Sequence, residues 1–394
     1  MKNDRWGTIG LRGDFPPPLL RWHSPNRPSS DAFASPPLLD WISSIHSSSI
    51  CLTGHTTSNR TRSKQETKQN NQTAIMSAMA KRQKEKGDAF IAEAEQKLSK
   101  SKSSWFSSSK EKKYEEAAES MEQAANAYKV GGFNQEAGEA YRRAAEIHRD
   151  QLTNLNEASK DMAAAGKCFT KSNPEDAVKA FSEAVALYTD NGRITQAAKL
   201  CKECAELYEN EEVSTDSEKS SIVLAIESYE QASELFGMED AKSQSSQCLA
   251  KVAELCSGAL DPPDLTRAAQ IYDDLGRRCL DSNLLKFNAK GYFLQSTLCH
   301  LASGDPIGAT QALQRYEGVD YTFGESREGK FARQLVECVE NYDTEGFGTA
   351  CFEYDRISKL DPWKTSILVK VKKTIDDEAG GGGGDGEEDD FDLT

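Results

Sequence analysis

The sequence predicts an all-α protein: a TPR-like solenoid of antiparallel helical hairpins. Two observations predict this fold class. One pattern of small and large residues recurs through most of the chain at steps near 20 residues. The chain of 394 residues also has no stretch close to the roughly 20 apolar residues that a membrane span needs. A soluble helical repeat array fits both observations.

The repeat is defined by a small anchoring residue and by the positions four, seven and eleven residues later, which share one helix face. Two copies are Ala117, Met121, Ala124, Tyr128 and Ala177, Phe181, Ala184, Tyr188. The nine anchors between residues 117 and 289 are separated by 20, 21, 19, 20, 28, 20, 23 and 21 residues. A helix with its turn takes about 20 residues, so two of them form a hairpin of about 40. We therefore expect a helical-hairpin array over residues 76–285, with a longer loop near residues 211–221.

Residues 1–75 differ in composition from the rest of the chain. They hold seven of the twelve prolines and have a net charge of +4, whereas the remaining residues have a net charge of −19. No helical period is present, so we expect a disordered N-terminal extension. A transit peptide is the alternative, because this segment is also rich in Arg and Ser. Transit peptides are amphipathic, however, and this segment is not.

In the C-terminal part, over residues 286–375, the repeat becomes less regular. Its last helix is predicted to start at Asp361-Pro362, where Asp is a good N-cap and Pro suits the first helical position. Trp363, Ile367, Val371 and Ile375 then follow at four-residue steps and should pack on the array. Residues 376–394 are expected to form a flexible, Gly-rich acidic tail with nine acidic and no basic residues.

The composition excludes several classes of function. A formal net charge of −15 argues against a general nucleic-acid role, which needs a basic face. Ten cysteines are too few for a disulfide scaffold, so we expect a reducing, cytosolic compartment. The phosphate loop, the H-E-x-x-H pattern and the G-x-S-x-G pattern are all missing, which indicates that the protein is not an enzyme and needs no cofactor.

The remaining candidates for chemistry are better explained as core residues. His148 and His300 occupy the +11 core position of their repeats, so a packed role is favoured over a catalytic one. Cys201 and Cys204 form a C-x-x-C, yet no second Cys or His pair at zinc-ligand spacing accompanies them. We therefore predict no metal site and expect both cysteines in the core.

Two features are candidates for binding. Trp105-Phe106 lies between runs of Ser and Lys; these rings either fold back onto the first hairpin or dip into an anionic bilayer. Basic residues also recur near the predicted turns between helices. Two interpretations remain open: these residues are ordinary solvated charges, or they form an aligned basic stripe. They include Lys171, Arg193, Lys199, Lys251 and Lys290.

Several segments from about Met76 onward resemble the soluble NSF attachment proteins (SNAPs), the alpha type more than the gamma type. The matching stretches are Tyr188-Thr189-Asp190-Asn191-Gly192-Arg193, Leu284-Leu285-Lys286-Phe287-Asn288-Ala289-Lys290, Lys359-Leu360-Asp361-Pro362-Trp363 and Lys370-Val371-Lys372-Lys373-Thr374-Ile375, followed by an acidic end with a penultimate leucine. The resemblance implies a TPR-like right-handed solenoid that ends in a C-terminal helical bundle, which we expect over residues 286–375. It implies an adaptor in vesicle-mediated transport that binds assembled SNARE four-helix bundles. It also implies recruitment and stimulation of the hexameric ATPase NSF, which disassembles those bundles.

The resemblance implies three sets of site residues. The SNARE-facing residues are Lys171, Arg193, Lys199, Lys251 and Lys290. The membrane-contact residues are Trp105 and Phe106, so the protein is expected in the cytoplasm and peripherally on membranes. The ATPase-stimulating residues are Leu393 with Asp389, Asp390 and Asp392. A gamma-type SNAP and a generic TPR-like scaffold that binds peptides are the alternatives.

Overall fold

The computed structural model describes residues 55–102, 107–210, 213 and 219–379. The chain divides into two compact units, Met1–Lys64 and Gln65–Thr394, and the fold described below is that of the second unit. The predictions for residues 1–54, for Trp105 and Phe106, and for residues 380–394, which include Leu393, Asp389, Asp390 and Asp392, concern positions outside the described residues. Residues 55–75 of the expected disordered extension are helical and belong to α1, and residues 376–379 of the expected tail belong to α14.

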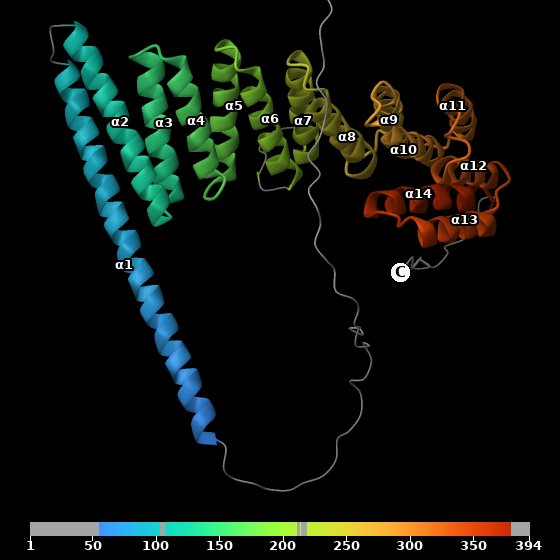
Figure 1. The fold of residues 1–394 in the computed structure, drawn as a ribbon, viewed down its shortest axis with the longest axis horizontal. Helices are drawn as coiled ribbons and strands as arrows, with labels where there is room; N and C mark the ends of the chain where they lie inside the picture. The colour runs from blue at the N-terminus through green and yellow to red at the C-terminus, as the bar shows by residue number, and fades with distance from the viewer. Residues whose placement is uncertain (1–54, 103–106, 211–212, 214–218, 380–394) are drawn as a thin grey trace, which may run out of the picture. The chain divides into compact units, whose positions relative to one another are not determined.

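Within the described residues the secondary structure is entirely helical, which confirms the predicted all-α class (Figure 1). α6 ends at Glu209 and α7 begins at Ser221, so the longer connection lies where the enlarged repeat step predicts it. The helices are α1 (His55–Lys102), α2 (Ser107–Gly131), α3 (Asn134–Asp150), α4 (Leu155–Phe169), α5 (Pro174–Asp190), α6 (Ile194–Glu209), α7 (Ser221–Met238), α8 (Lys242–Gly258), α9 (Leu265–Leu280), the 3-10 helix η1 (Lys286–Asn288), α10 (Ala289–Ala302), α11 (Pro306–Val319), α12 (Arg327–Glu340), α13 (Thr344–Ile357) and α14 (Pro362–Ala379).

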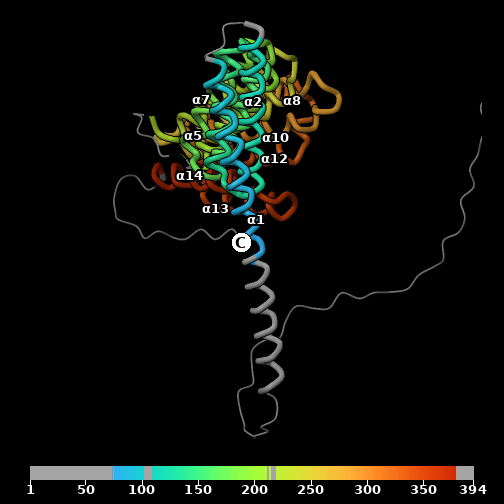
Figure 2. Tube along the Cα trace, turned by 90° about the vertical axis from the view of Figure 1, so that its left-hand side faces the viewer, coloured from blue at the N-terminus to red at the C-terminus, as the bar shows by residue number. Residues whose placement is uncertain are grey.

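Consecutive helices form antiparallel hairpins, and ion pairs between alternate helices show that the array has two layers. Figure 1 shows α2 to α8 side by side in chain order, and Figure 2 shows α1 running alongside α2. Ion pairs in the odd-numbered layer are Lys84–Glu136 (α1 to α3), Arg149–Glu183 (α3 to α5) and Arg267–Glu230 (α9 to α7). Ion pairs in the even-numbered layer are Lys167–Glu203 (α4 to α6) and Lys251–Glu209 (α8 to α6).

The repeat positions form the core between the layers. In α5, Ala177, Phe181, Ala184 and Tyr188 are all buried. A few repeat positions are only half-buried, among them Leu249 in α8 and His300 in the last turn of α10, so the core prediction for His300 is only partly correct. Cys201 and Cys204 are buried, as predicted.

Glycines allow aromatic rings to pack closely between neighbouring helices. Phe181 of α5 lies directly against Gly166 of α4, and Phe293 of α10 lies in the same way against Gly276 of α9. Both glycines occupy the position eight residues after their repeat anchor, and both rings occupy the +4 position of the next repeat. A side chain at either glycine would displace the ring, so close packing requires glycine at these sites.

A second core joins the C-terminal helices. Its residues come from α9 to α14, and the residues of α9 belong to both cores; the boundary at residue 285 therefore remains a prediction. α14 begins as predicted, because the Asp361 carboxylate accepts a hydrogen bond from the Lys364 backbone N–H at 2.8 Å. Ile367, Val371 and Ile375 are buried. Trp363 is partly buried and packs against both cores.

Candidate cationic binding surface

The five predicted basic residues do not form one cluster. Lys171 follows the end of α4 and Arg193 precedes the start of α6, so these two residues lie at opposite ends of α5. The 17 residues of α5 span about 25 Å. Lys199 is on α6, Lys251 is on α8, and Lys290 is in the first turn of α10. Any partner that contacts all five must therefore cover several hairpins.

Two of these residues share one side of the even-numbered layer. Lys199 lies on α6 and Lys251 on α8, whereas Lys171 lies in the turn after α4. Counted from the anchors of their repeats, Lys199 and Lys251 occupy positions +2 and +6, and a difference of four residues returns a helix to within about 40° of the same direction. The ion pair between Lys251 and Glu209 shows that α6 and α8 are neighbours in the layer.

The predicted residues differ in how available their charges are. Among the residues that the structure describes, Lys171, Arg193 and Lys199 have no ion-pair partner, and Lys171 and Lys199 are exposed. The Nζ of Lys251 instead lies 2.9 Å from Glu209 and 3.3 Å from Glu254. The Nζ of Lys290 donates a weaker hydrogen bond to the Thr322 carbonyl, at 3.4 Å. Lys171, Arg193 and Lys199 can thus meet an acidic partner without breaking an existing ion pair.

Lys251 belongs to a partly buried network. Glu209 accepts hydrogen bonds from the Tyr229 hydroxyl at 2.6 Å and from Lys251 at 2.9 Å. Burial opposes ionisation of Glu209, but these two donors outweigh it and hold its pKa below the ordinary value. Burial likewise works against the charge of Lys251, whose pKa is nevertheless raised because Glu209 and Glu254 stabilise the cation. The network therefore ties α8 to α6 and α7 as well as contributing charge.

Three more lysines of the same layer were missed from the sequence. Lys160 occupies position +2 of its repeat, the same position as Lys199, and Lys167 follows seven residues later. Lys202 lies on α6. All three are ion-paired: Lys160 with Glu157 at 2.7 Å, Lys167 with Glu203 at 3.4 Å and Lys202 with Glu206 at 3.6 Å. Comparing the +2 positions of successive repeats would have identified Lys160.

Cys201 and Cys204 are poorly suited to nucleophilic chemistry. Burial raises the pKa of the Cys201 and Cys204 thiols to about 12, so both remain protonated near neutral pH.

A membrane span would need a long, apolar helix, and the part of the chain that the structure describes contains none.

Comparison with known proteins identifies the family. The family model "Soluble NSF attachment protein, SNAP" matches residues 85–376. The chain belongs to the SNAP family. The predicted likeness to the alpha type is confirmed by two relatives. The alpha-soluble NSF attachment protein of Vitis vinifera is 36% identical over 74% of this chain and 94% of its own length. The alpha-soluble NSF attachment protein of Mus musculus is 38% identical over 73% of this chain and 94% of its own length.

The vesicular-fusion protein SEC17 of Komagataella phaffii is 32% identical over 74% of this chain and 95% of its own length. These SNAP relatives are therefore matched along almost their whole length. Among solved structures, BtubC from P. vanneervenii aligns with 61% of this chain and 93% of its own, with 13% identity and a TM-score of 0.33. This similarity is too low to imply a shared fold.

Proposed function

We propose that this SNAP binds assembled SNARE four-helix bundles and attaches the hexameric ATPase NSF to them, so that NSF can disassemble the bundles after vesicle fusion. The observation that carries the proposal is the match to proteins named as NSF attachment and vesicular-fusion proteins over about 94% of their length. The chain acts as an adaptor and NSF supplies the ATP hydrolysis, so no catalytic site is required in the chain.

The SNARE-binding residues are Lys171, Arg193, Lys199, Lys251 and Lys290. The surface of a SNARE bundle is largely acidic, and attraction between opposite charges speeds and orients association. Lys171, Arg193 and Lys199 should contribute most, because no ion pair among the described residues competes for their charge. Lys251 can contribute only by sharing its ammonium group with Glu209 and Glu254.

Two further contacts concern residues outside the described part of the chain. Trp105 and Phe106 insert into the bilayer surface, so the protein acts in the cytoplasm and peripherally on membranes. Leu393, with Asp389, Asp390 and Asp392, contacts NSF and stimulates its ATPase. Both roles follow from the resemblance of these segments to the family.

A charge-reversal experiment tests the SNARE surface. Lys199→Glu places a negative charge at an exposed position on α6 of the even-numbered layer, whereas Lys179→Glu makes the same change at an exposed position on α5 of the odd-numbered layer. We expect Lys199→Glu to weaken binding to a purified SNARE bundle by about three- to tenfold, equivalent to about 1 kcal/mol. The defect should shrink as salt screens the charges. Equal binding of the SNARE bundle by the two variants would show that Lys199 is not part of the SNARE-binding surface.

The generic peptide-binding alternative has one specific feature in its favour. A groove of about 890 Å³ lies between the start of α8, the end of α9 and the start of α10, and Ser246, Arg278 and Tyr292 are among the residues that line it. If this groove were the main binding site, Arg278→Glu would abolish partner binding and Lys199→Glu would not. The SNARE adaptor predicts the opposite order of effects.

A further inference from the structure

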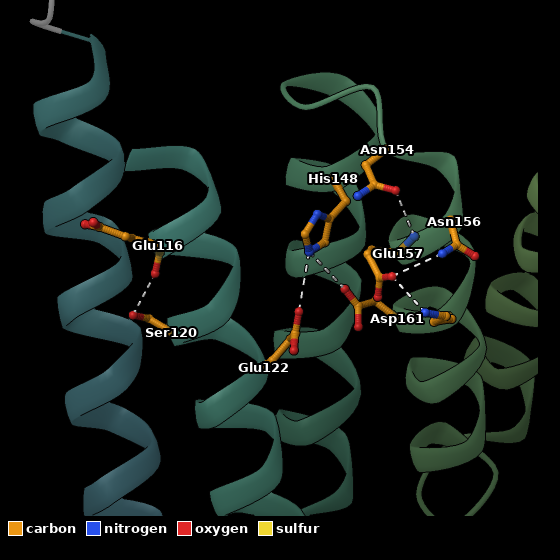
Figure 3. A network of polar contacts seen from close by, with 9 residues as sticks. Glu116, Ser120, Glu122, His148, Asn154, Asn156, Glu157 and Asp161 are labelled. Atoms are coloured by element: carbon orange, nitrogen blue, oxygen red, sulfur yellow. Dashed lines mark hydrogen bonds and ion pairs between the residues drawn. The ribbon is translucent and has the colours of Figure 1, made fainter. Parts of the chain in front are cut away.

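A histidine and two carboxylates converge between the first hairpins, away from the cationic surface. Glu122 comes from α2, His148 from α3 and Asp161 from α4, and their side chains point toward one another (Figure 3). The Nε2 of His148 lies 3.4 Å from Oε1 of Glu122 and 3.6 Å from Oδ2 of Asp161. The three groups can place their ligand atoms within 4.8 Å of one another. Three consecutive helices thus contribute one polar atom each to a single point.

Two of the three side chains are buried and incompletely hydrogen-bonded. Asp161 is 7% exposed and His148 is 8% exposed. Oδ2 of Asp161 and Nδ1 of His148 have no hydrogen-bond partner among the described residues. Native proteins seldom leave such buried polar atoms unpaired, so each of them requires an explanation. An ion seated between Nε2 and Oδ2 would satisfy the carboxylate oxygen.

The cluster combines three groups that donate electron pairs. The side chains bring one imidazole nitrogen and two carboxylate oxygens to the same point, all within 4.8 Å of one another. The nearby cation Lys160 is ion-paired with Glu157 at 2.7 Å. A metal cation is the ligand that this set of donor atoms suits.

We propose that Glu122, His148 and Asp161 bind one divalent transition-metal ion, with Zn²⁺ as the best match. One imidazole nitrogen and two carboxylate oxygens form a ligand set that Zn²⁺ accepts, whereas Ca²⁺ and Mg²⁺ prefer oxygen ligands alone. Zinc–ligand distances of about 2.0–2.2 Å place tetrahedral ligands roughly 3.4 Å apart. The separations of Nε2 of His148 from the two carboxylate oxygens, 3.4 Å and 3.6 Å, are close to that value, and all three ligand atoms lie within 4.8 Å of one another.

The geometry also allows entry and a fourth ligand. The side chain of Glu122 is 38% exposed, so the ion can enter from its side and keep one water molecule. Rotation of this partly exposed side chain can adjust the distance between Glu122 and Asp161. Nε2 coordinates the ion while Nδ1 keeps the proton of the neutral imidazole. The bound ion cross-links α2, α3 and α4 and stabilises the first hairpins.

The test uses the full-length chain, stripped with a chelator and kept reduced. Isothermal titration with Zn²⁺ should show one site per chain, and Zn²⁺ should raise the thermal unfolding midpoint. Because the chain contains ten cysteines, Co²⁺ provides a second readout. Nitrogen and oxygen ligands give only the weak visible bands of Co²⁺, whereas thiolate ligands add intense near-ultraviolet charge-transfer bands. We expect the visible bands alone at the first equivalent.

Three variants and one control decide the assignment. Asp161→Asn, His148→Gln and Glu122→Gln should each weaken Zn²⁺ binding at least tenfold. Glu122 is partly exposed, so its variant should keep the fold of the wild type. His300→Gln is the matched control, because His300 of α10 lies 3.6 Å from Asp305, the N-cap of α11, in another His–Asp pair. The control should bind Zn²⁺ like the wild type. Unchanged affinity in Glu122→Gln and Asp161→Asn, thiolate bands at the first equivalent, or no Zn²⁺ site in the wild type would each overturn the proposal.

Discussion

The indole nitrogen of Trp363 on α14 donates a hydrogen bond to the hydroxyl of Ser257 in the last turn of α8, at 2.9 Å. Lys370 of α14 reinforces this contact by donating to the Ser257 carbonyl at 3.0 Å. A cation at the end of a helix also interacts favourably with the unpaired carbonyl groups there. α14 is thereby fastened to the repeat array, 106 residues earlier in the chain.

This contact predicts energetic coupling between the two side chains. Trp363→Phe keeps an aromatic ring beside Tyr272 but loses the N–H donor, and we expect the free energy of unfolding to fall by about 1–2 kcal/mol. Urea unfolding of Trp363→Phe, Ser257→Ala and the double variant forms a double-mutant cycle. The double variant should be less destabilised than the sum of the single variants by about 0.5–1 kcal/mol. Strict additivity would show that the hydrogen bond contributes nothing.

The close packing of Phe181 on Gly166 predicts opposite effects of alanine at two helical glycines. A Cβ at Gly166 would clash with the Phe181 ring, so Gly166→Ala should lower the free energy of unfolding by about 1–3 kcal/mol. Gly348 of α13 has open space around it, and Gly348→Ala should raise stability by about 0.5–1 kcal/mol through better helix propensity. Thermal unfolding of both variants measures these two changes in stability. Stabilisation by Gly166→Ala would contradict the packing.

The Lys251–Glu209 pair predicts a pH-dependent contribution to stability. A carboxylate whose pKa is lowered by folding contributes stability above its unfolded pKa of about 4.3, and this contribution is lost as the pH falls through the folded pKa. Lys251→Met should therefore cost about 1 kcal/mol at pH 7, because the pair is partly exposed. The difference from the wild type should shrink below about pH 4.

Urea unfolding at several pH values measures this effect. Lys202→Met is the control, since its i,i+4 pair with Glu206 is more exposed and longer, at 3.6 Å. Its effect should stay within about 0.5 kcal/mol at every pH. If Lys251→Met loses the same stability at pH 3 and pH 7, the Glu209 charge does not account for the effect.

The proposed membrane loop predicts a difference between lipid and detergent. Replacing Trp105 and Phe106 together by serine removes two aromatic rings, which supply about 3–5 kcal/mol when partly buried in a bilayer. SNARE disassembly on liposomes should slow at least tenfold, whereas disassembly in detergent should match the wild type. An equal loss in detergent would show that the rings serve folding and not membrane contact.

Much of the fold could be predicted from the sequence because the helical repeat is a local pattern. The small residue at the anchor and the large residue eleven positions later are visible in one helix at a time, as Ala177 and Tyr188 illustrate. The same holds for the start of α14, which depends only on Asp361 and its neighbours. The role of Gly166 was not visible, because it depends on which ring of the next helix points toward it.

The candidate sites were less accessible to sequence reasoning. His148 was expected in the core and is buried there, but its proximity to Glu122 and Asp161 depends on the relative rotation of three helices. The ion pairs that separate Lys251 from the unpaired Lys171 and Lys199 also join different helices. Charge alone identifies a candidate residue, whereas only the packing shows whether that charge is available.

Disassembly of a purified SNARE bundle by NSF and ATP, with and without this chain, tests the central claim most directly. The account predicts that disassembly requires the chain. It also predicts that Lys199→Glu slows disassembly by weakening SNARE binding, and that Leu393→Ala slows it without weakening SNARE binding. Disassembly at the same rate without the chain, or none in the presence of the folded chain, would contradict the adaptor function.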